Sequence, residues 1–233
     1  MRDGFSRGVY YVENNLFFLF MLRVRGFQVY PISTKSRVRI DSLTREDIQG
    51  WGHIVQTVTF PDASLCVTDV CFGGDGPTQL MLLREESYIH NLGTQNARFV
   101  RDFIPGQASR APEHRMWKYQ CRNRGAQPQR TFYSFSDAVD QLPPDFGVVN
   151  CFTTASLDSS AVTSIYMVKF LRRATTNGKD GQATTKGQQQ EVFRKRMLMS
   201  ELVRENLERK TRVVQECQSK GEEVTGFEGV VWS

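Results

Sequence analysis

Hydrophobic and polar positions along the chain predict one helix followed by a region rich in β-structure. The run LFFLFML fills positions 16–22, and the pattern around it predicts a helix over 10–25 that stops at Gly26. This helix is apolar on every side across the run, so more than one of its faces needs cover. Positions 27–30 and 37–40 alternate in polarity and predict two short strands.

The clearest predicted unit is a β-hairpin. Two β-rich runs, HIVQTVTF at 53–60 and LCVTDVCF at 65–72, flank the turn PDAS. His53 begins the first run and Asp69 lies late in the second, so the hairpin brings a histidine and a carboxylate near each other. They share a face of the sheet if paired residue numbers sum to an even value, and the sequence leaves that register open.

The rest of the chain divides at loops. The stretch VCFGGDGPT after Asp69 predicts a loop whose glycine backbone could approach a ligand closely. It matches neither the Walker nor the dinucleotide-binding fingerprint, and an ordinary turn explains it too. Two prolines in LPPDFGVVN indicate a domain boundary near Asn150. Positions 174–190 predict a loop between two β-like runs, IYMVKFLRR and VFRKRMLM.

Length and charge limit the class of protein. A chain of 233 residues with 39% hydrophobic content can bury a core. The net charge is +5, and positions 169–220 alone carry +7, with 13 Lys and Arg against 6 Asp and Glu. This segment lacks the interleaved aromatic residues of a stacking platform, so we expect a solvated or anion-facing surface and no nucleic-acid partner.

Cysteine usage and the apolar run predict the compartment. The five cysteines are odd in number, match no metal-ligand or disulfide spacing, and indicate a reducing compartment and no metal site; they are Cys66, Cys71, Cys121, Cys151 and Cys217. The run 16–22 is far shorter than the about 20 residues that a bilayer requires. Glu13, Asn14 and Asn15 stop the apolar run on its N-terminal side, so it is also a poor signal peptide. We therefore expect a cytoplasmic protein without a membrane partner.

A histidine beside a carboxylate suggests part of a catalytic triad. An acid that fixes the imidazole tautomer, with an imidazole that activates a nucleophile, forms the base half of a catalytic triad. His53 and Asp69 could fill these roles, but a third member is required. The alternative is that His53 is a buried histidine satisfied by a strand-end carboxylate. His90 and His114 have no such partner in the sequence and are expected at the surface.

Three ordered segments resemble the arylamine N-acetyltransferase family. SRGVYYVENNLFFLFMLRVRGFQVY is similar to the family's nucleophile segment, where an Arg-Gly-Gly-Tyr-Cys run precedes Glu-Asn at the head of a helix. GWGHIVQTVTF resembles the segment with the triad histidine, and CVTDVCFGGDGPT the one with the triad aspartate. LPPDFGVVNCFTTAS and KRMLMSELVRENLERKTRVVQ resemble the later region, particularly of fungal members. The similarity runs from about Met1 to about Glu216.

The resemblance implies ping-pong acetyl transfer from acetyl-CoA to arylamines or arylhydrazines, a reaction of xenobiotic metabolism. In the family a cysteine thiolate takes the acetyl group as a thioester, helped by a helix N-terminus and a histidine that lower its pKa. Carried over by position, His53 is the base and Asp69 its orienter. The nucleophile does not carry over, because Tyr11 stands in place of the cysteine and Val9 in place of the second motif glycine.

Tyr11 and Cys71 are the other candidate nucleophiles. A Tyr11 phenol has an ordinary pKa near 10, and its ring would occupy space that the acetyl group needs. Cys71 is the cysteine nearest to the expected site in sequence, but it replaces a motif glycine and is expected to pack at a strand end. The chain therefore resembles a degenerate member with little or no transferase activity.

The resemblance also implies which residues face CoA. Gly73, Gly74 and Gly76 keep the glycine-rich loop, and Ser156 and Ser159 lie in the Ser/Thr-rich segment that is near CoA in the family. Family members carry a helical bundle before the nucleophile segment, and the resemblance implies that most of it is missing from this sequence. We expect the site helix to expose an apolar patch that could mediate self-association. The C-terminal GEEVTGFEGVVWS also departs from the family's closing helix, and a truncated gene copy or a gene model with wrong ends is the expected explanation of both ends.

The sequence therefore predicts an α+β fold of the arylamine N-acetyltransferase and cysteine-protease-like type. Its expected domains are a helical remnant at 1–26, a β-barrel domain at 27–150 and an α/β lid at 151–233. The predicted family function is arylamine N-acetylation, impaired in this chain. The alternatives are a non-catalytic protein that binds CoA or an arylamine as a pseudoenzyme or partner subunit, and an unstable gene product.

Overall fold

The structure, a computed structural model, describes residues 11–37, 48–123, 127–157, 159, 162, 164–174 and 190–201, and its first element is a helix, α1 (Tyr11–Val24). The helix ends just before Gly26, as the sequence predicts. Gly26 has a φ of +85°, a left-handed conformation that glycine adopts without strain. The N-terminal residues of the predicted helix, before Tyr11, lie outside the described residues.

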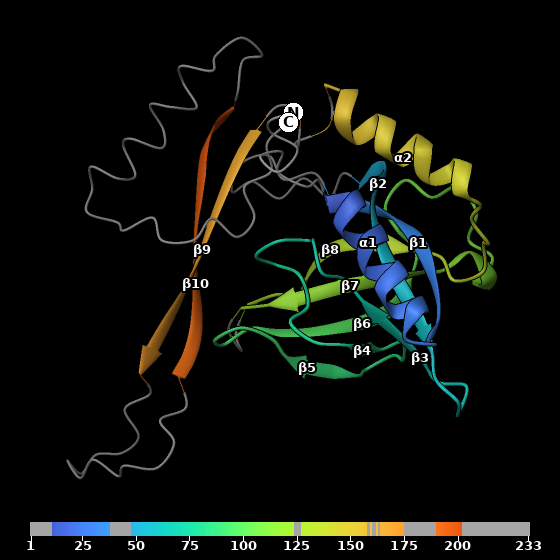
Figure 1. Ribbon diagram of the computed structural model, residues 1–233. Helices are drawn as coiled ribbons and strands as arrows, with labels where there is room; N and C mark the ends of the chain where they lie inside the picture. Colours follow the sequence, from blue (N-terminus) through green and yellow to red (C-terminus); the bar gives the residue numbers. More distant parts are fainter. Residues whose placement is uncertain are drawn as a thin grey trace, which may run out of the picture.

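An eight-stranded antiparallel sheet follows, and it curls into a nearly closed barrel (Figure 1). Its strands lie in the order β4-β3-β2-β1-β8-β7-β6-β5. Their bounds are β1 (Gln28–Arg37), β2 (Ile48–Thr59), β3 (Leu65–Thr68), β4 (Met81–Leu82), β5 (Tyr88–His90), β6 (Asn96–Asp102), β7 (Met116–Arg122) and β8 (Arg130–Phe135), with a 3₁₀ turn η1 (Pro112–His114) before β7. The predicted hairpin is β2 and β3, which confirms that unit.

Strand β1 differs from the prediction. The sequence predicts separate strands at 27–30 and 37–40, but β1 runs unbroken from Gln28 to Arg37 with Pro31 inside it. Proline lacks the backbone N–H, so it suits a strand position with a free side. Strand β1 pairs with β2 along its length but with β8 only at Lys35 and Ser36, which leaves one side of Pro31 unpaired among the described residues. Positions 38–40 lie outside the described residues.

Aromatic side chains fill the barrel. Phe99, Tyr119, Tyr133 and Phe135 are fully buried, and the rings of Tyr119 and Tyr133 stack with centroids 4.7 Å apart. Such rings bury large apolar areas, and their stacking and edge-to-face contacts add to the burial energy. The core therefore packs the inner faces of β6, β7 and β8 against the part of the sheet that carries His53 and Asp69.

Two helices cover β1 and β2 from outside the barrel (Figure 1). Helix α2 (Pro143–Ala155) begins at the two prolines that the sequence suggested as a boundary. Proline is common in the first helical turn because its missing N–H would have no partner there. The Asp145 carboxylate also accepts the N–H of Leu142 at 2.8 Å, which caps the helix. Asn150, the expected boundary, lies within this helix.

A separate two-stranded antiparallel sheet consists of β9 (Ser164–Ala174) and β10 (Gln190–Glu201). These strands match the two β-like runs that flank the predicted loop. The α+β class with a barrel-like sheet is thereby confirmed, whereas the domain limits 1–26, 27–150 and 151–233 stay predictions. Among the described residues, no helix is long and apolar enough to cross a membrane.

Candidate active site

A histidine and a carboxylate meet where β2 and β3 lie side by side. The strand register pairs Gln56 with Thr68, an even sum, so His53 in β2 and Asp69 after β3 share a face. The imidazole Nε2 of His53 lies 2.8 Å from Oδ2 of Asp69. Both residues are buried, with 4% and 5% of their surface exposed. The sequence prediction that the hairpin brings them together is confirmed.

The carboxylate orients the imidazole. Besides its contact with His53, Asp69 accepts the backbone N–H of Cys71 at Oδ1, at 3.1 Å. With both oxygens engaged, the carboxylate has a fixed direction. It favours the imidazole tautomer that donates from Nε2, which leaves the lone pair on Nδ1. The pair is therefore built as a base that would act through Nδ1.

Three aromatic rings surround the imidazole. The ring centroids of Phe72, Tyr11 and Tyr133 lie 5.1, 5.3 and 6.0 Å from that of His53. Burial raises the pKa of Tyr133 well above its ordinary value, so this phenol stays neutral. The rings restrict the movement of the imidazole and its access to water.

Tyr11 is the first described residue of α1, and its phenol is already engaged. The Tyr11 hydroxyl donates to the backbone carbonyl of Gly52, the residue before His53, at 2.8 Å. A hydroxyl has a single proton and a carbonyl can only accept, so that proton is not directed at His53. The Tyr11 ring packs against a buried cluster that includes Ile54 in β2 and Phe146 in α2. Tyr11 therefore links α1 to the histidine strand.

Asn15, one turn further along α1, ties the helix to the same strands. It is completely buried, and its backbone carbonyl accepts the side-chain amide of Gln56 at 2.7 Å. Its side-chain oxygen accepts the N–H of Val70, next to Asp69, at 3.4 Å. The amide-rich start of α1 thus fixes the helix against both halves of the His53–Asp69 pair.

The glycine-rich loop is fastened to the barrel. Gly73 is exposed, has a φ of +81° and closes a tight turn by accepting the N–H of Gly76 at 2.9 Å. Gly74 and Gly76 are buried, and a Cβ at Gly76 would lie 3.1 Å from that of Phe72. The Asn91 amide donates to the Gly76 carbonyl at 2.9 Å. Only Gly73 of the three glycines faces solvent.

The comparison with known proteins identifies the family. A model of the N-acetyltransferase family matches residues 4–217. The chain belongs to the arylamine N-acetyltransferase family. The resemblance inferred from the three sequence segments is thereby confirmed. No curated protein matches the sequence at a significant level.

Solved arylamine N-acetyltransferases share the fold. The enzyme from Salmonella typhimurium is 17% identical, with a TM-score of 0.56 over 93% of this chain and 68% of that one. The enzyme from Nocardia farcinica is 25% identical, with a TM-score of 0.53 over 72% of this chain and 52% of that one. Arylamine N-acetyltransferase C from Bacillus anthracis is 14% identical, with a TM-score of 0.58 over 93% and 75%. The chain thus spans about half of the Nocardia protein and more of the other two.

Cys71 is poorly suited to act as the nucleophile of this arylamine N-acetyltransferase-family chain. Burial raises the pKa of its thiol to about 12, and the neighbouring Asp69 carboxylate contributes to that increase. The thiolate is the reactive form, so at neutral pH almost none of Cys71 would be nucleophilic.

The two serines lie at the end of α2. Ser156 is half-buried at the C-terminal cap of the helix, where its backbone N–H donates to Phe152 at 3.0 Å. Ser159 is buried, and its hydroxyl donates to the carbonyl of Thr153 at 3.0 Å. Of the five residues expected to face CoA in this family, Gly73 is thus exposed and Ser156 partly so.

Sequence reasoning missed the residues that support the pair. The enclosing rings of Phe72 and Tyr133 gave no signal, because aromatic residues in strands are usually core residues. Asn15 did give a signal, since a buried amide beside an apolar run needs partners. Among the described residues, no group of three or more His, Cys, Asp or Glu side chains could hold a metal ion.

Proposed function

We propose that this chain is an arylamine N-acetyltransferase-type protein that keeps the histidine–aspartate pair of the site but has lost the acetyl-thioester step. The observation that carries this proposal is Tyr11, which lies at the start of α1 beside His53 and donates its only proton to Gly52. In the family, acetyl-CoA is the donor and a small aromatic amine the acceptor. We propose that the chain derives from that chemistry and performs it poorly.

The missing thiol explains the loss. In the family reaction, the cysteine thiolate attacks the acetyl carbonyl, the bond to the CoA sulfur breaks, and CoA leaves as a thiol after taking a proton from the imidazolium. The amine then attacks the thioester, expels the cysteine thiolate and gives its proton to the histidine. At Tyr11, a phenol would first have to give up its bond to Gly52. His53 and Asp69 would then be a base without a nucleophile.

Restoration of the thiol tests this proposal. In Tyr11→Cys, the new side chain would lie at a helix N-terminus beside His53, a setting that lowers the pKa of a thiol. We expect the variant to form an acetyl-enzyme with acetyl-CoA, detected by mass spectrometry of the intact protein and mapped to position 11. The natural chain should form none at that position, and transfer to an arylamine should be at least about 10²-fold slower than in the variant.

Two further variants control the experiment. Tyr30→Cys places a new thiol on β1, where Tyr30 is 37% exposed and pairs with Thr57, four positions along β2 from His53, and should not become acetylated. Tyr11→Cys combined with His53→Ala should lose thioester formation. If the natural chain turns over rapidly and His53→Ala abolishes that turnover, the proposal is contradicted, because the base would then act without a thiol.

A second candidate function is binding without catalysis. We propose that the chain can hold CoA or an arylamine as a pseudoenzyme or partner subunit, with Gly73 and Ser156 as the accessible members of the five expected CoA positions. Calorimetry with acetyl-CoA tests it, and no heat of binding at millimolar ligand would reject it. A cooperative melting transition in the same sample would reject the reading of an unstable gene product.

The cytoplasm is the proposed compartment. The cysteines of the described residues are all free thiols: Cys66, Cys71, Cys121 and Cys151. Proteins of oxidising compartments commonly pair their cysteines, so free thiols favour a reducing one. Localisation of the tagged protein by microscopy would test this assignment.

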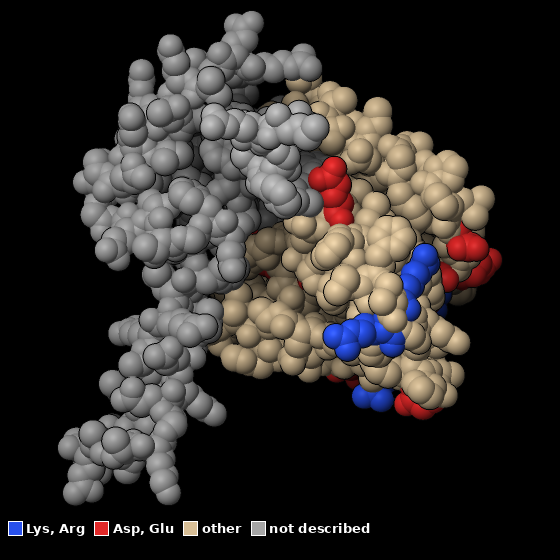
Figure 2. Space-filling model, in the orientation of Figure 1, with Lys and Arg blue, Asp and Glu red and all other residues tan. Residues whose placement is uncertain are grey.

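Self-association through α1 is the remaining proposal. Phe17, Phe20, Met21 and Val24 recur at helical spacing and are 66%, 59%, 46% and 84% exposed. Figure 2 shows the surface over α1 as largely tan, with acidic atoms at one end and basic atoms near the other. A stripe of this kind suits association.

The proposed occupant of this surface is a second copy of the chain. Glu13 lies in the first turn of α1 and Arg23 in the last, so two antiparallel copies of the helix would place opposite charges together. Sedimentation should show a dimer that Phe20→Glu dissociates and that Val139→Glu, at another exposed apolar residue, leaves intact. A natural chain that is monomeric at every concentration would contradict this.

A further inference from the structure

A pocket lies on the other face of the sheet from the His53 side chain. Side chains alternate along strands, so Lys118 and Gln120 of β7 point away from the core that Tyr119 enters. The pocket has a volume of about 480 Å³ and is bordered by β1, β7, β8 and the loop that contains Phe103 and Arg110. Pockets of roughly 300–1,000 Å³ are typical of small-molecule sites.

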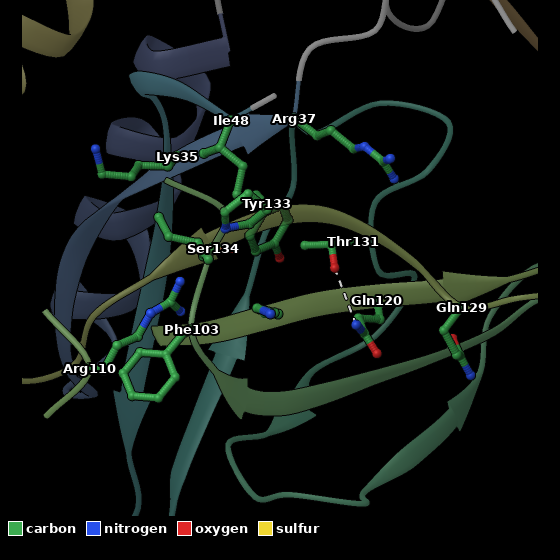
Figure 3. A pocket seen from close by; sticks show the side chains of 13 residues that line it. Lys35, Arg37, Ile48, Phe103, Arg110, Gln120, Gln129, Thr131, Tyr133 and Ser134 are labelled. Carbon is green, nitrogen blue, oxygen red and sulfur yellow. Dashed lines mark hydrogen bonds between the residues drawn. The ribbon is translucent and has the colours of Figure 1, made fainter. Parts of the chain in front are cut away.

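Basic residues surround this pocket. Its lining includes Lys35, Arg37, Arg110 and Lys118, and no Asp or Glu among the described residues. In Figure 3, Arg37 and Arg110 lie on different sides of the pocket. Cations gathered around one cavity repel one another, which disfavours the folded state unless an anion compensates. The arrangement is therefore expected to have an anionic ligand.

The strand register fixes two of these cations in one row. Ser134 in β8 pairs with Lys35 in β1 and with Lys118 in β7, so the lysines flank the serine about 10 Å apart, two strand spacings. Ser134 is completely buried, and no hydrogen-bond partner of its hydroxyl is found in the described part of the chain. Gln120 and Thr131, joined by a 3.2 Å hydrogen bond, add amide and hydroxyl groups beside this row.

The charges are only partly compensated by the protein. Lys118 Nζ lies 2.7 Å from Oδ2 of Asp102, whose side chain is 62% exposed, so water screens that pair. Lys35 Nζ lies 4.6 Å from the ring centre of Trp51, and the Arg110 guanidinium lies 5.1 Å from that of Phe103. An aromatic ring orients a cation but does not neutralise its charge. Lys35 and Arg110 thus keep positive charge at the pocket.

We propose that this pocket binds a small phosphorylated anion of about nucleotide size. A planar guanidinium can donate two hydrogen bonds to one phosphate, and a lysine binds phosphate as a point charge. The volume exceeds what inorganic phosphate fills and leaves room for an organic group beside Phe103. The proposal does not depend on acetyl transfer, because Lys118 and Ser134 lie on the other face of the sheet from His53. Among the described residues, Tyr133 alone borders both places. The phosphates of CoA or those of a separate nucleotide could supply this chemistry.

Titration calorimetry of the full chain with pyrophosphate, ADP and acetyl-CoA tests the proposal. We expect submillimolar binding of ADP that weakens as NaCl is raised. Arg110→Glu, a change in an exposed loop residue, should weaken binding at least about tenfold. Lys35→Gln should weaken it less. Arg84→Glu is the matched control, since Arg84 is exposed and does not line the pocket, and should bind ADP as the natural chain does.

The three ligands separate the sources of the phosphate. Acetyl-CoA that binds, competes with ADP and loses affinity in Arg110→Glu would assign the pocket to the CoA phosphates. Binding of ADP without competition from acetyl-CoA would assign it to another nucleotide. No binding of any of the three at millimolar concentration, or equal affinities in Arg110→Glu and Arg84→Glu, would overturn the proposal. None of these outcomes depends on a thioester at position 11.

Discussion

Replacement of Tyr11 by phenylalanine decides whether the phenol is a structural group. The change removes one oxygen and keeps the ring that packs against Ile54 and Phe146. It breaks the 2.8 Å bond to the Gly52 carbonyl in a partly buried site. The net loss for one such hydrogen bond is about 0.5–1.5 kcal/mol of unfolding free energy. Urea slopes of about 1–3 kcal/mol per molar turn 1 kcal/mol into a midpoint decrease of about 0.3–1 M.

Tyr133→Phe is the matched control for this experiment. Tyr133 is completely buried near the same imidazole, but its hydroxyl has no hydrogen-bond partner in the described part of the chain. Removal of an unsatisfied buried hydroxyl abolishes a desolvation cost of about 1–3 kcal/mol. The urea midpoint should therefore stay the same or rise. The two variants carry the same chemical change, so their difference isolates the bond to Gly52.

Tryptophan fluorescence can follow both unfolding transitions. Trp51 packs against the cluster that contains Tyr11, and Trp117 belongs to the barrel core, so one chain reports on both regions. The reasoning is refuted if Tyr11→Phe leaves the midpoint unchanged, or if Tyr133→Phe lowers it as much as Tyr11→Phe does. Either result would mean that the phenol of Tyr11 does not stabilise the contact between α1 and β2.

Three further outcomes are expected. In the Tyr11→Cys background, Asp69→Asn should slow thioester formation at least about 10²-fold at pH 7 by removing the acceptor of the His53 Nε2 proton, as quenched-flow mass spectrometry would show. Asn91→Ala should cost about 2 kcal/mol in urea unfolding and speed hydrogen exchange of the glycine-rich loop, because two bonds that hold it are lost. Because burial raises the pKa of the Cys71 thiol to about 12, iodoacetamide at pH 8 should modify the exposed Cys151 before Cys71, and alkylation of Cys71 should increase about tenfold per pH unit as its thiolate fraction grows; equal rates for the two at pH 8 in peptide mapping would contradict this.

Short-range sequence patterns predicted the elements that hold the His53–Asp69 pair. The turn PDAS and its two flanking β-rich runs gave the β2–β3 hairpin, and Gly26 gave the end of α1. The strand register was open because a one-residue slip leaves the sequence pattern unchanged while it inverts every side chain. Only the paired backbone showed that His53 and Asp69 share a face.

Two prolines lie inside elements of the structure, at positions that share one physical property. Proline cannot donate a backbone hydrogen bond. The sequence predicted short strands on either side of Pro31, and from the prolines of LPPDFGVVN a domain boundary near Asn150, which stays a prediction. Pro31 lies where β1 has a neighbour on one side only, and Pro143 lies where a helix has no acceptor to offer. Which backbone groups lack partners is a tertiary property, so the sequence could not settle either case. The basic pocket was missed likewise, since Lys35 and Arg110 are 75 positions apart in the chain.

The presence of His53 and Asp69 does not by itself argue for catalysis in this chain. A buried imidazole needs a hydrogen-bond partner, and Asp69 supplies one while it also accepts the N–H of Cys71. The pair therefore supports the fold even where no nucleophile stands beside it. If it acts only in this way, Asp69→Asn should lower the stability of the natural chain and leave unchanged whatever acetyl transfer is measured for it. A loss of transfer in a variant that still melts cooperatively would instead show that His53 works as a base with Tyr11 in place.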